Sequence, residues 1–190
     1  GNGITFLDDM HILATAKHFL GDGGTDKGID QGDTIVDEFT LKDIHGLPYY
    51  DAIDSCVLSI MASFNSWNGL KSHGNKYLLM DILKSQMNFD GFIVGDWNGH
   101  GQIEGCEDSN CPDAFNSGVD IFMAPIEWEG LYWNTFNQVN SGEITFEAAK
   151  ALAKELGASF YDWNIDQVVD QATNTMENVL GRKLGWDSDD

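Results

Sequence analysis

The chain has 190 residues, of which 42% are hydrophobic, so it is long enough for one domain with a sizeable core. Its 31 acidic and 10 basic residues give a formal net charge of −21. Such an acidic surface repels the phosphates of nucleic acids and of anionic lipids, which argues against a nucleic-acid partner. No run approaches the roughly 20 apolar residues of a membrane-spanning helix, so we expect no membrane partner either.

Apolar runs bounded by turn residues recur along the first two thirds of the chain. They predict four buried strands, at 11–20, 56–67, 91–97 and 118–125. Helical segments are predicted between and after them, at 47–56, 75–87, 111–118 and 129–142. Continuous apolar strands that alternate with helices indicate a parallel sheet covered by helices, which is an α/β fold.

The pattern changes at about residue 143. From there the sequence shows long amphipathic helical patterns with no strand between them, and it closes on the acidic run 187–190. We therefore divide the chain into an α/β unit at 1–142 and a helical extension at 143–190, whose acidic end we expect to be disordered.

The three cysteines differ in their surroundings. Cys106 and Cys111 lie in a short polar segment, where their five-residue separation could close a small disulfide loop. A disulfide would indicate an oxidising compartment, extracellular or periplasmic. Zinc is the rival interpretation, but three cysteines without clustered histidines give it little support, so we predict no metal and no cofactor. Cys56 lies in an apolar stretch and is predicted to be a buried thiol.

Three of the predicted strands are followed by chemically useful side chains. Active sites of parallel α/β proteins lie at the C-terminal ends of the strands, so these groups are expected to meet on one rim. Carboxylates and amides hydrogen-bond to sugar hydroxyls, and indole rings stack on sugar faces, so the set suits a carbohydrate. In chain order the side chains are Lys17, His18, Asp22, Ser63, Asn65, Trp67, Asp96 and Trp97.

Each of these side chains also has a purely structural interpretation. Asp96 could cap the helix that follows it, Lys17 and His18 could be a buried ion-pair donor and a core histidine, and the tryptophans could belong to the core. The glycine-rich segment 21–24 lacks the spacing of a phosphate-binding loop. The convergence of several polar groups on one rim favours the chemical interpretation.

Four segments follow one another along the chain: "ATAKHFLGDGGT" (14–25), "MASFNSWNG" (61–69), "GFIVGDWNGHG" (91–101) and "GVDIFMAP" (118–125). With their neighbours they closely resemble family 3 glycoside hydrolases, and the nearest branch is that of bacterial β-glucosidases and exo-β-glucanases. The resemblance covers residues 1 to about 142 in the right order. It implies a β-linked glucoside or glucan as substrate, and Asp96 as the nucleophile of a retaining enzyme. The predicted substrate-binding residues are Lys17, His18, Asp22, Ser63, Trp67 and Trp97, with the Lys17 ammonium beside Asp96.

The resemblance also shows what these 190 residues do not supply. The family fold is a (β/α)8 barrel followed by a second domain, which carries the general acid/base glutamate. Four βα units predict half of a TIM-type barrel, whose open edges need a second copy, a complementary half or the terminal helices to cover them. Glu127 and Glu129 follow the fourth strand, but the resemblance assigns the acid/base role elsewhere.

Two functions are therefore compatible with the sequence. The first is the nucleophile-bearing piece of a retaining glycoside hydrolase that needs other parts for full activity. The second is a non-catalytic carbohydrate-binding or structural protein that descends from such an enzyme.

Overall fold

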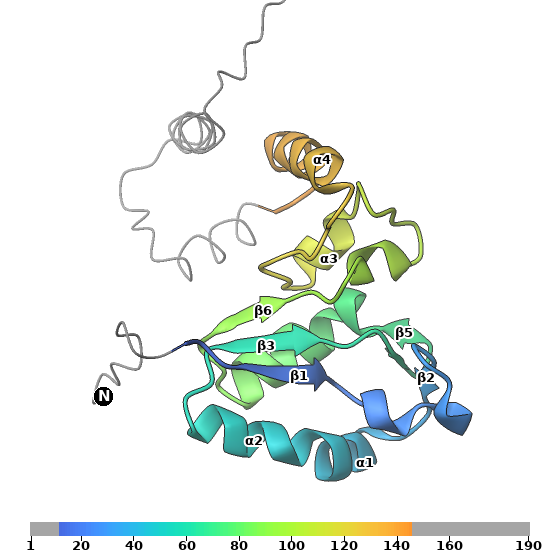
Figure 1. The fold of residues 1–190 in the computed structure, drawn as a ribbon, viewed down its shortest axis with the longest axis vertical. Coiled ribbons are helices and arrows are strands. Elements are labelled where there is room, and N and C mark those ends of the chain that lie inside the picture. The colour runs from blue at the N-terminus through green and yellow to red at the C-terminus, as the bar shows by residue number, and fades with distance from the viewer. Residues whose placement is uncertain (1–11, 146–190) are drawn as a thin grey trace, which may run out of the picture.

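The computed structural model describes residues 12–145, and its centre is a parallel sheet (Figure 1). Strands β1 (Thr15–Phe19), β3 (Ser59–Ala62) and β6 (Phe92–Val94) are parallel and lie in the order β1-β3-β6. These strands fall within the first three predicted apolar runs. The α/β class and the parallel sheet are thereby confirmed.

The fourth predicted strand, 118–125, is wrong as a strand. The segment runs beside β6, but it forms a single parallel bridge, between Val94 and Ile121. The reason is that the Asp120 carboxylate accepts the backbone N–H of Ile93 at 2.6 Å, where a strand would offer a carbonyl oxygen. Gly118, at φ 103°, also departs from extended backbone. A regular ladder therefore does not form.

The helices lie where the apolar periodicity placed them, with one exception. Their bounds are α1 (Glu38–Thr40), α2 (Leu47–Asp54), Tyr77–Gln86, α3 (Pro112–Asn116) and α4 (Trp128–Ser141). The first one starts well before the predicted residue 47, because α1 continues into α2 through the π-helical segment Leu41–Gly46. Asp37 caps this start, accepting the backbone N–H of Thr40 at 2.7 Å.

A second, small sheet was not predicted. It contains β2 (Asp33–Thr34), β4 (Ser66–Trp67) and β5 (Leu70–Lys71), with β4 between the other two. Asn68 and Gly69 have φ values of 49° and 88° and make the tight turn between β4 and β5, so the Asn-Gly pair was an available signal for this hairpin. Figure 1 shows β2 and β5 at the end toward which β1 and β3 point, so this sheet lies at the same end of the main sheet as the predicted rim.

The core lies between the main sheet and its helices. All four residues of β3 are buried, because the strand has a neighbour on each side. Phe19 packs edge-on against Tyr49 of α2 at 4.9 Å between ring centroids. The side chain of Phe39 in α1, in contrast to these core rings, is 76% exposed. On the far side of β1 from β3, no strand of residues 12–145 pairs with it.

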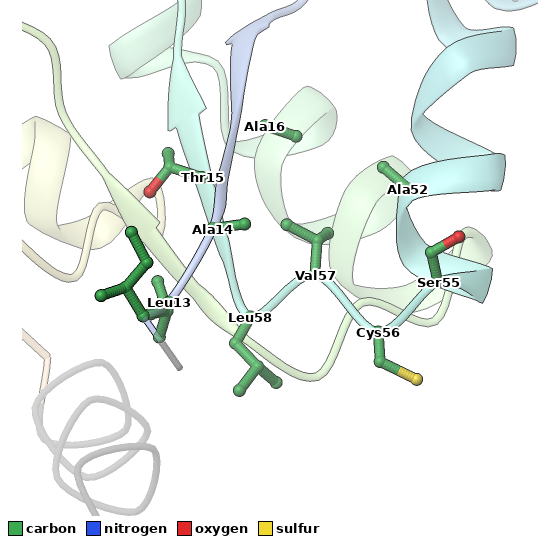
Figure 2. A pocket seen from close by; sticks show the side chains of 10 residues that line it. Leu13, Ala14, Thr15, Ala16, Ala52, Ser55, Cys56, Val57 and Leu58 are labelled. Carbon is green, nitrogen blue, oxygen red and sulfur yellow. The ribbon is translucent and has the colours of Figure 1, made fainter. Parts of the chain in front are cut away.

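Cys56 is not the buried thiol that the sequence predicts. It is free and half-buried, and its φ of 64° places it in the turn between α2 and β3 rather than in the strand. It lines an apolar hollow of about 410 Å³ at the starts of β1 and β3, together with residues such as Leu13, Val57 and Leu58. Figure 2 shows these side chains around the hollow. The hollow lies at the end of the sheet opposite the predicted rim.

The helical extension begins at the edge of the described residues, and from 146 onward it lies outside them. The division at 142 therefore stays a prediction. Within 12–145, no helix is both long and apolar enough to cross a membrane.

Gly91, at the start of β6, allows a close approach of two strands. A Cβ there would overlap the carbonyl oxygen of Leu58, whereas a Cβ at Gly23 would meet nothing within 4 Å. We expect Gly91→Ala to lower the free energy of unfolding by about 2 kcal/mol or more, since backbone cannot move aside cheaply. Gly23→Ala is the matched control and should be neutral or slightly stabilising. Urea denaturation of both variants measures the difference, and equal stabilities would contradict the proposed close approach.

Candidate active site

His18 lies between two carboxylates on the rim. Its Nδ1 is 3.1 Å from Oδ2 of Asp22, and its Nε2 is 3.5 Å from Oδ2 of Asp96. The three side chains come from the end of β1 and the end of β6, which are separated in the sheet by β3. The side chain of Asp96 is 14% exposed and that of His18 is 29% exposed, so a ligand can reach the pair from solvent.

Asp96 does not cap a helix. Its Oδ1 accepts the backbone N–H of its neighbour Trp97 at 2.7 Å, and the residue before the next short helix, Gly99–Gln102, is Asn98. The second oxygen, Oδ2, faces His18. The structure therefore favours the chemical interpretation of this carboxylate over the structural one.

The backbone of Asp96 is held by a buried histidine. Its N–H donates to Nε2 of His73 at 2.9 Å, and His73 is 1% exposed. Burial lowers the pKa of His73 to about 4, although the charge of Asp96 opposes the shift. The imidazole is consequently neutral at physiological pH and keeps the lone pair that accepts this hydrogen bond.

A hollow of about 440 Å³ lies on the Asp22 side of His18, between β1 and α2. Its polar lining includes Lys17, His18, Asp22, His45 and Tyr49. Burial, and secondarily the charge of Asp22, raise the pKa of the Tyr49 hydroxyl. Lys17 lines this hollow, and within the described residues it forms no ion pair with Asp96. The expected contact between the ammonium and the carboxylate is thus absent from residues 12–145.

The residues that follow β3 support the rim from inside. Ser63 and Asn65 are fully buried, and the Asn65 amide donates to the Leu20 carbonyl at 3.1 Å. Trp67 is half-buried, and its indole N–H donates to the Val36 carbonyl at 2.9 Å. Trp97, by contrast, is 58% exposed. Of the predicted sugar-stacking rings, Trp97 is the one that presents most of its surface to solvent, and Ser63 does not reach the surface.

A disulfide loop supports the segment after Asp96. Cys106 and Cys111 are joined, so they do not offer free thiolates to zinc. Within this loop Asp108 accepts the side-chain amide of Asn98 at 2.8 Å, and its backbone oxygen lies 2.7 Å from Nε2 of His100. The loop therefore braces the turn that carries Trp97 and Asn98.

Sequence reasoning missed His73 and Asp108. Neither directly follows a strand of the main sheet, and both reach the site through folding, so the ends of the predicted strands gave no signal for either. Among residues 12–145 there is no group of three or more histidine, cysteine, aspartate or glutamate side chains that could hold a metal ion.

The described residues thus form a parallel α/β unit with a carboxylate, a histidine and an exposed indole beyond the C-terminal ends of its strands. Residues 2–156 match the glycosyl hydrolase family 3 N-terminal domain. The chain belongs to this family, whose members are glycoside hydrolases, as the sequence analysis predicts.

Relatives and solved structures agree with this assignment. A beta-xylosidase of Formosa agariphila is 38% identical over 105 residues, which are 55% of this chain and 14% of that protein. A probable beta-glucosidase L of Aspergillus terreus is 28% identical over 181 residues, 87% of this chain and 23% of that protein. The chain thus spans less than a quarter of the length of these relatives.

The crystal structure of an exo-1,3/1,4-beta-glucanase from a Pseudoalteromonas species is similar to this chain. The two are 49% identical with a TM-score of 0.77, over 78% of this chain and 18% of that one. A beta-glucosidase of Erythrobacter marinus, 23% identical, has the same fold with a TM-score of 0.71 over 79% of this chain and 20% of its own.

The low pKa of His73 makes stability depend on pH. The folded protein keeps this imidazole neutral down to pH about 4, whereas the unfolded chain protonates it near 6.5, so the unfolded state binds more protons in between. The free energy of unfolding should therefore fall by up to about 3 kcal/mol as pH drops through 6.5 to 4, and the contribution of His73 to the slope fades above about pH 7.5. Urea unfolding across this range, compared with His73→Gln, isolates the contribution. Identical pH slopes in the two proteins would contradict it.

The disulfide should contribute measurably to stability. Replacing Cys106 and Cys111 together by serine is expected to cost about 2 kcal/mol, the chain-entropy value for so short a loop. Cys56→Ser is the control, because its half-buried thiol is free, and it should stay within about 0.5 kcal/mol of the parent chain. Chemical denaturation under non-reducing conditions measures both, and a double variant as stable as the control would refute the bracing role.

Proposed function

We propose that this chain carries the nucleophile of a retaining β-glucosidase or exo-β-glucanase, with Asp96 as the attacking carboxylate. The substrate is a β-linked glucoside or glucan, cleaved at its non-reducing end. The observation that carries the proposal is the placement of Asp96, at the C-terminal end of β6 and 3.5 Å from His18. Family membership and the 49% identity to an exo-1,3/1,4-beta-glucanase support the substrate class.

The chemistry follows from the positions of the groups. Oδ1 of Asp96 accepts the N–H of Trp97, which leaves Oδ2, on the His18 side, to attack the anomeric carbon. The bond that forms joins carboxylate oxygen to sugar, the bond that breaks releases the aglycone, and water later hydrolyses the glycosyl-enzyme. His18, fixed by Asp22, and Lys17 in the adjoining hollow are the candidates to bind sugar hydroxyls. Trp97 offers a flat exposed face for stacking.

A retaining glycosidase also needs a general acid to protonate the leaving group. The family resemblance places that glutamate in a second domain. We therefore propose that full activity on natural glycosides needs chain outside the α/β unit, and that a second copy or a complementary barrel half covers the open edge of β1. Substrates with activated leaving groups do not need the acid.

The second candidate is a non-catalytic carbohydrate-binding or assembly protein. The exposed indole of Trp97 and the partly exposed His18–Asp22 pair favour it, since these groups can hold a sugar without any reaction. The disulfide between Cys106 and Cys111 supports an extracellular or periplasmic location for either function.

Labelling with an activated 2-deoxy-2-fluoro-β-glucoside separates the two candidates. If Asp96 is the nucleophile, mass spectrometry of the digested chain should show one fluoroglucosyl adduct on its peptide. Asp96→Asn should abolish the adduct, whereas Asp90→Asn, an exposed carboxylate at the other end of β6, should not change it. If calorimetry shows that the chain binds sugar but no adduct forms, the hydrolase proposal is overturned in favour of the binding protein. A separate measurement of the mass in solution shows whether copies of the chain assemble.

A further inference from the structure

His73 holds the segment that follows β6 with one ring nitrogen. Nε2 accepts the backbone N–H of Asp96, after β6, at 2.9 Å. Because Nε2 is the acceptor, the proton of the neutral ring lies on Nδ1, which defines the tautomer. The backbone of Ser63, after β3, acts to raise the pKa of the ring and therefore lies near it.

The surroundings of the ring leave it little freedom. His73 is 1% exposed and lies in the short turn Ser72–Gly74, before the helix Tyr77–Gln86. A Cβ on Gly99 would overlap the imidazole, and the Phe64 ring lies 6.1 Å away between centroids. The turn after Asp96 therefore closes directly onto the ring, and no side chain intervenes at position 99.

A buried imidazole in this place can act on the site without touching a substrate. The ring holds the backbone of Asp96, and the carboxylate of that residue points at His18 with 14% of its side chain exposed. A displacement of a reacting group by about 1 Å can cost about a hundredfold in rate, so restraint of the backbone bears directly on the chemistry.

We propose that His73 is a positioning residue, which holds the backbone of Asp96 and thereby keeps its carboxylate against His18. The inference rests on the proposed function, because it assigns His73 a part in the attack by Asp96. Ser63, which is fully buried, then belongs to the surroundings of the ring rather than to the sugar site.

Two variants test the hydrogen bond to Asp96. His73→Gln places an amide oxygen as many bonds from Cα as Nε2, so it can still accept the Asp96 N–H. His73→Asn is one methylene shorter, so its amide does not reach Asp96. Both variants remove the imidazole, so the loss of the ring's packing is common to them.

The rate of fluoroglucosyl labelling is the first readout, measured on the full chain. The Gln variant should label within about threefold of the parent chain, and the Asn variant at least about tenfold more slowly. Urea unfolding reports any loss of fold in each variant. Equal labelling rates for folded Gln and Asn variants would overturn the positioning role.

A second readout requires no substitution and no reaction. In the ¹⁵N-labelled parent chain, the hydrogen bond should give a scalar coupling between the Asp96 amide nitrogen and His73 Nε2. Nε2 should also carry the chemical shift of an unprotonated nitrogen at neutral pH. The absence of this coupling in a folded chain, or a protonated Nε2, would refute the inference whatever the variants do.

The two proposals fail in different ways. If the parent chain shows the coupling but no label, the nucleophile assignment fails for this chain by itself. Positioning is then decided by the nuclear Overhauser contact between the His18 ring and the Asp96 Cβ protons. That contact should persist in His73→Gln and disappear in His73→Asn, and its persistence in both would overturn the inference.

Discussion

The parallel pairing of β1, β3 and β6 is the constraint from which the site follows. Parallel strands end on the same edge of a sheet, so His18 and Asp96 meet although they lie far apart along the chain and β3 separates their strands. The strand between them contributes buried groups instead, Ser63 and Asn65, which hydrogen-bond inside the protein. The outer strands thus lead to the candidate site residues His18 and Asp96, and the central strand leads to buried residues between them.

The two histidines of the site illustrate how burial decides chemistry. His18 is partly exposed between two carboxylates and is available to a ligand. His73 is enclosed, burial depresses its pKa to about 4, and its neutral ring serves as an acceptor for backbone. His18 is therefore a candidate to bind substrate, whereas His73 supports the backbone of Asp96 from inside the protein.

Further contacts hold the turn that follows β6 and Asp96. The disulfide between Cys106 and Cys111 closes the loop that holds Asp108, and Asp108 in turn holds Asn98, two residues beyond Asp96. On the opposite flank, the Lys71 ammonium donates to the carbonyl of Phe64 and to the side chain of Gln102, both at about 3 Å. The turn after β6 is thus held on two sides by groups outside the main sheet, which leaves Trp97 as its most exposed ring.

The amino-acid sequence by itself determined the three strands of the main sheet and most of the helices, and it pointed to the rim beyond them. The apolar run around Ile60 forms a strand because a sheet centre buries it on both faces, and the strand ends then point to Asp96 and His18. Only the tertiary structure decided which polar groups face solvent: Ser63 and Asn65 are buried, and Lys17 lies in the hollow beside α2 rather than against Asp96. It also decided that Asp120 replaces a strand hydrogen bond and that His73 holds Asp96. These outcomes depend on contacts between segments distant along the chain, which local periodicity and strand-end position do not encode.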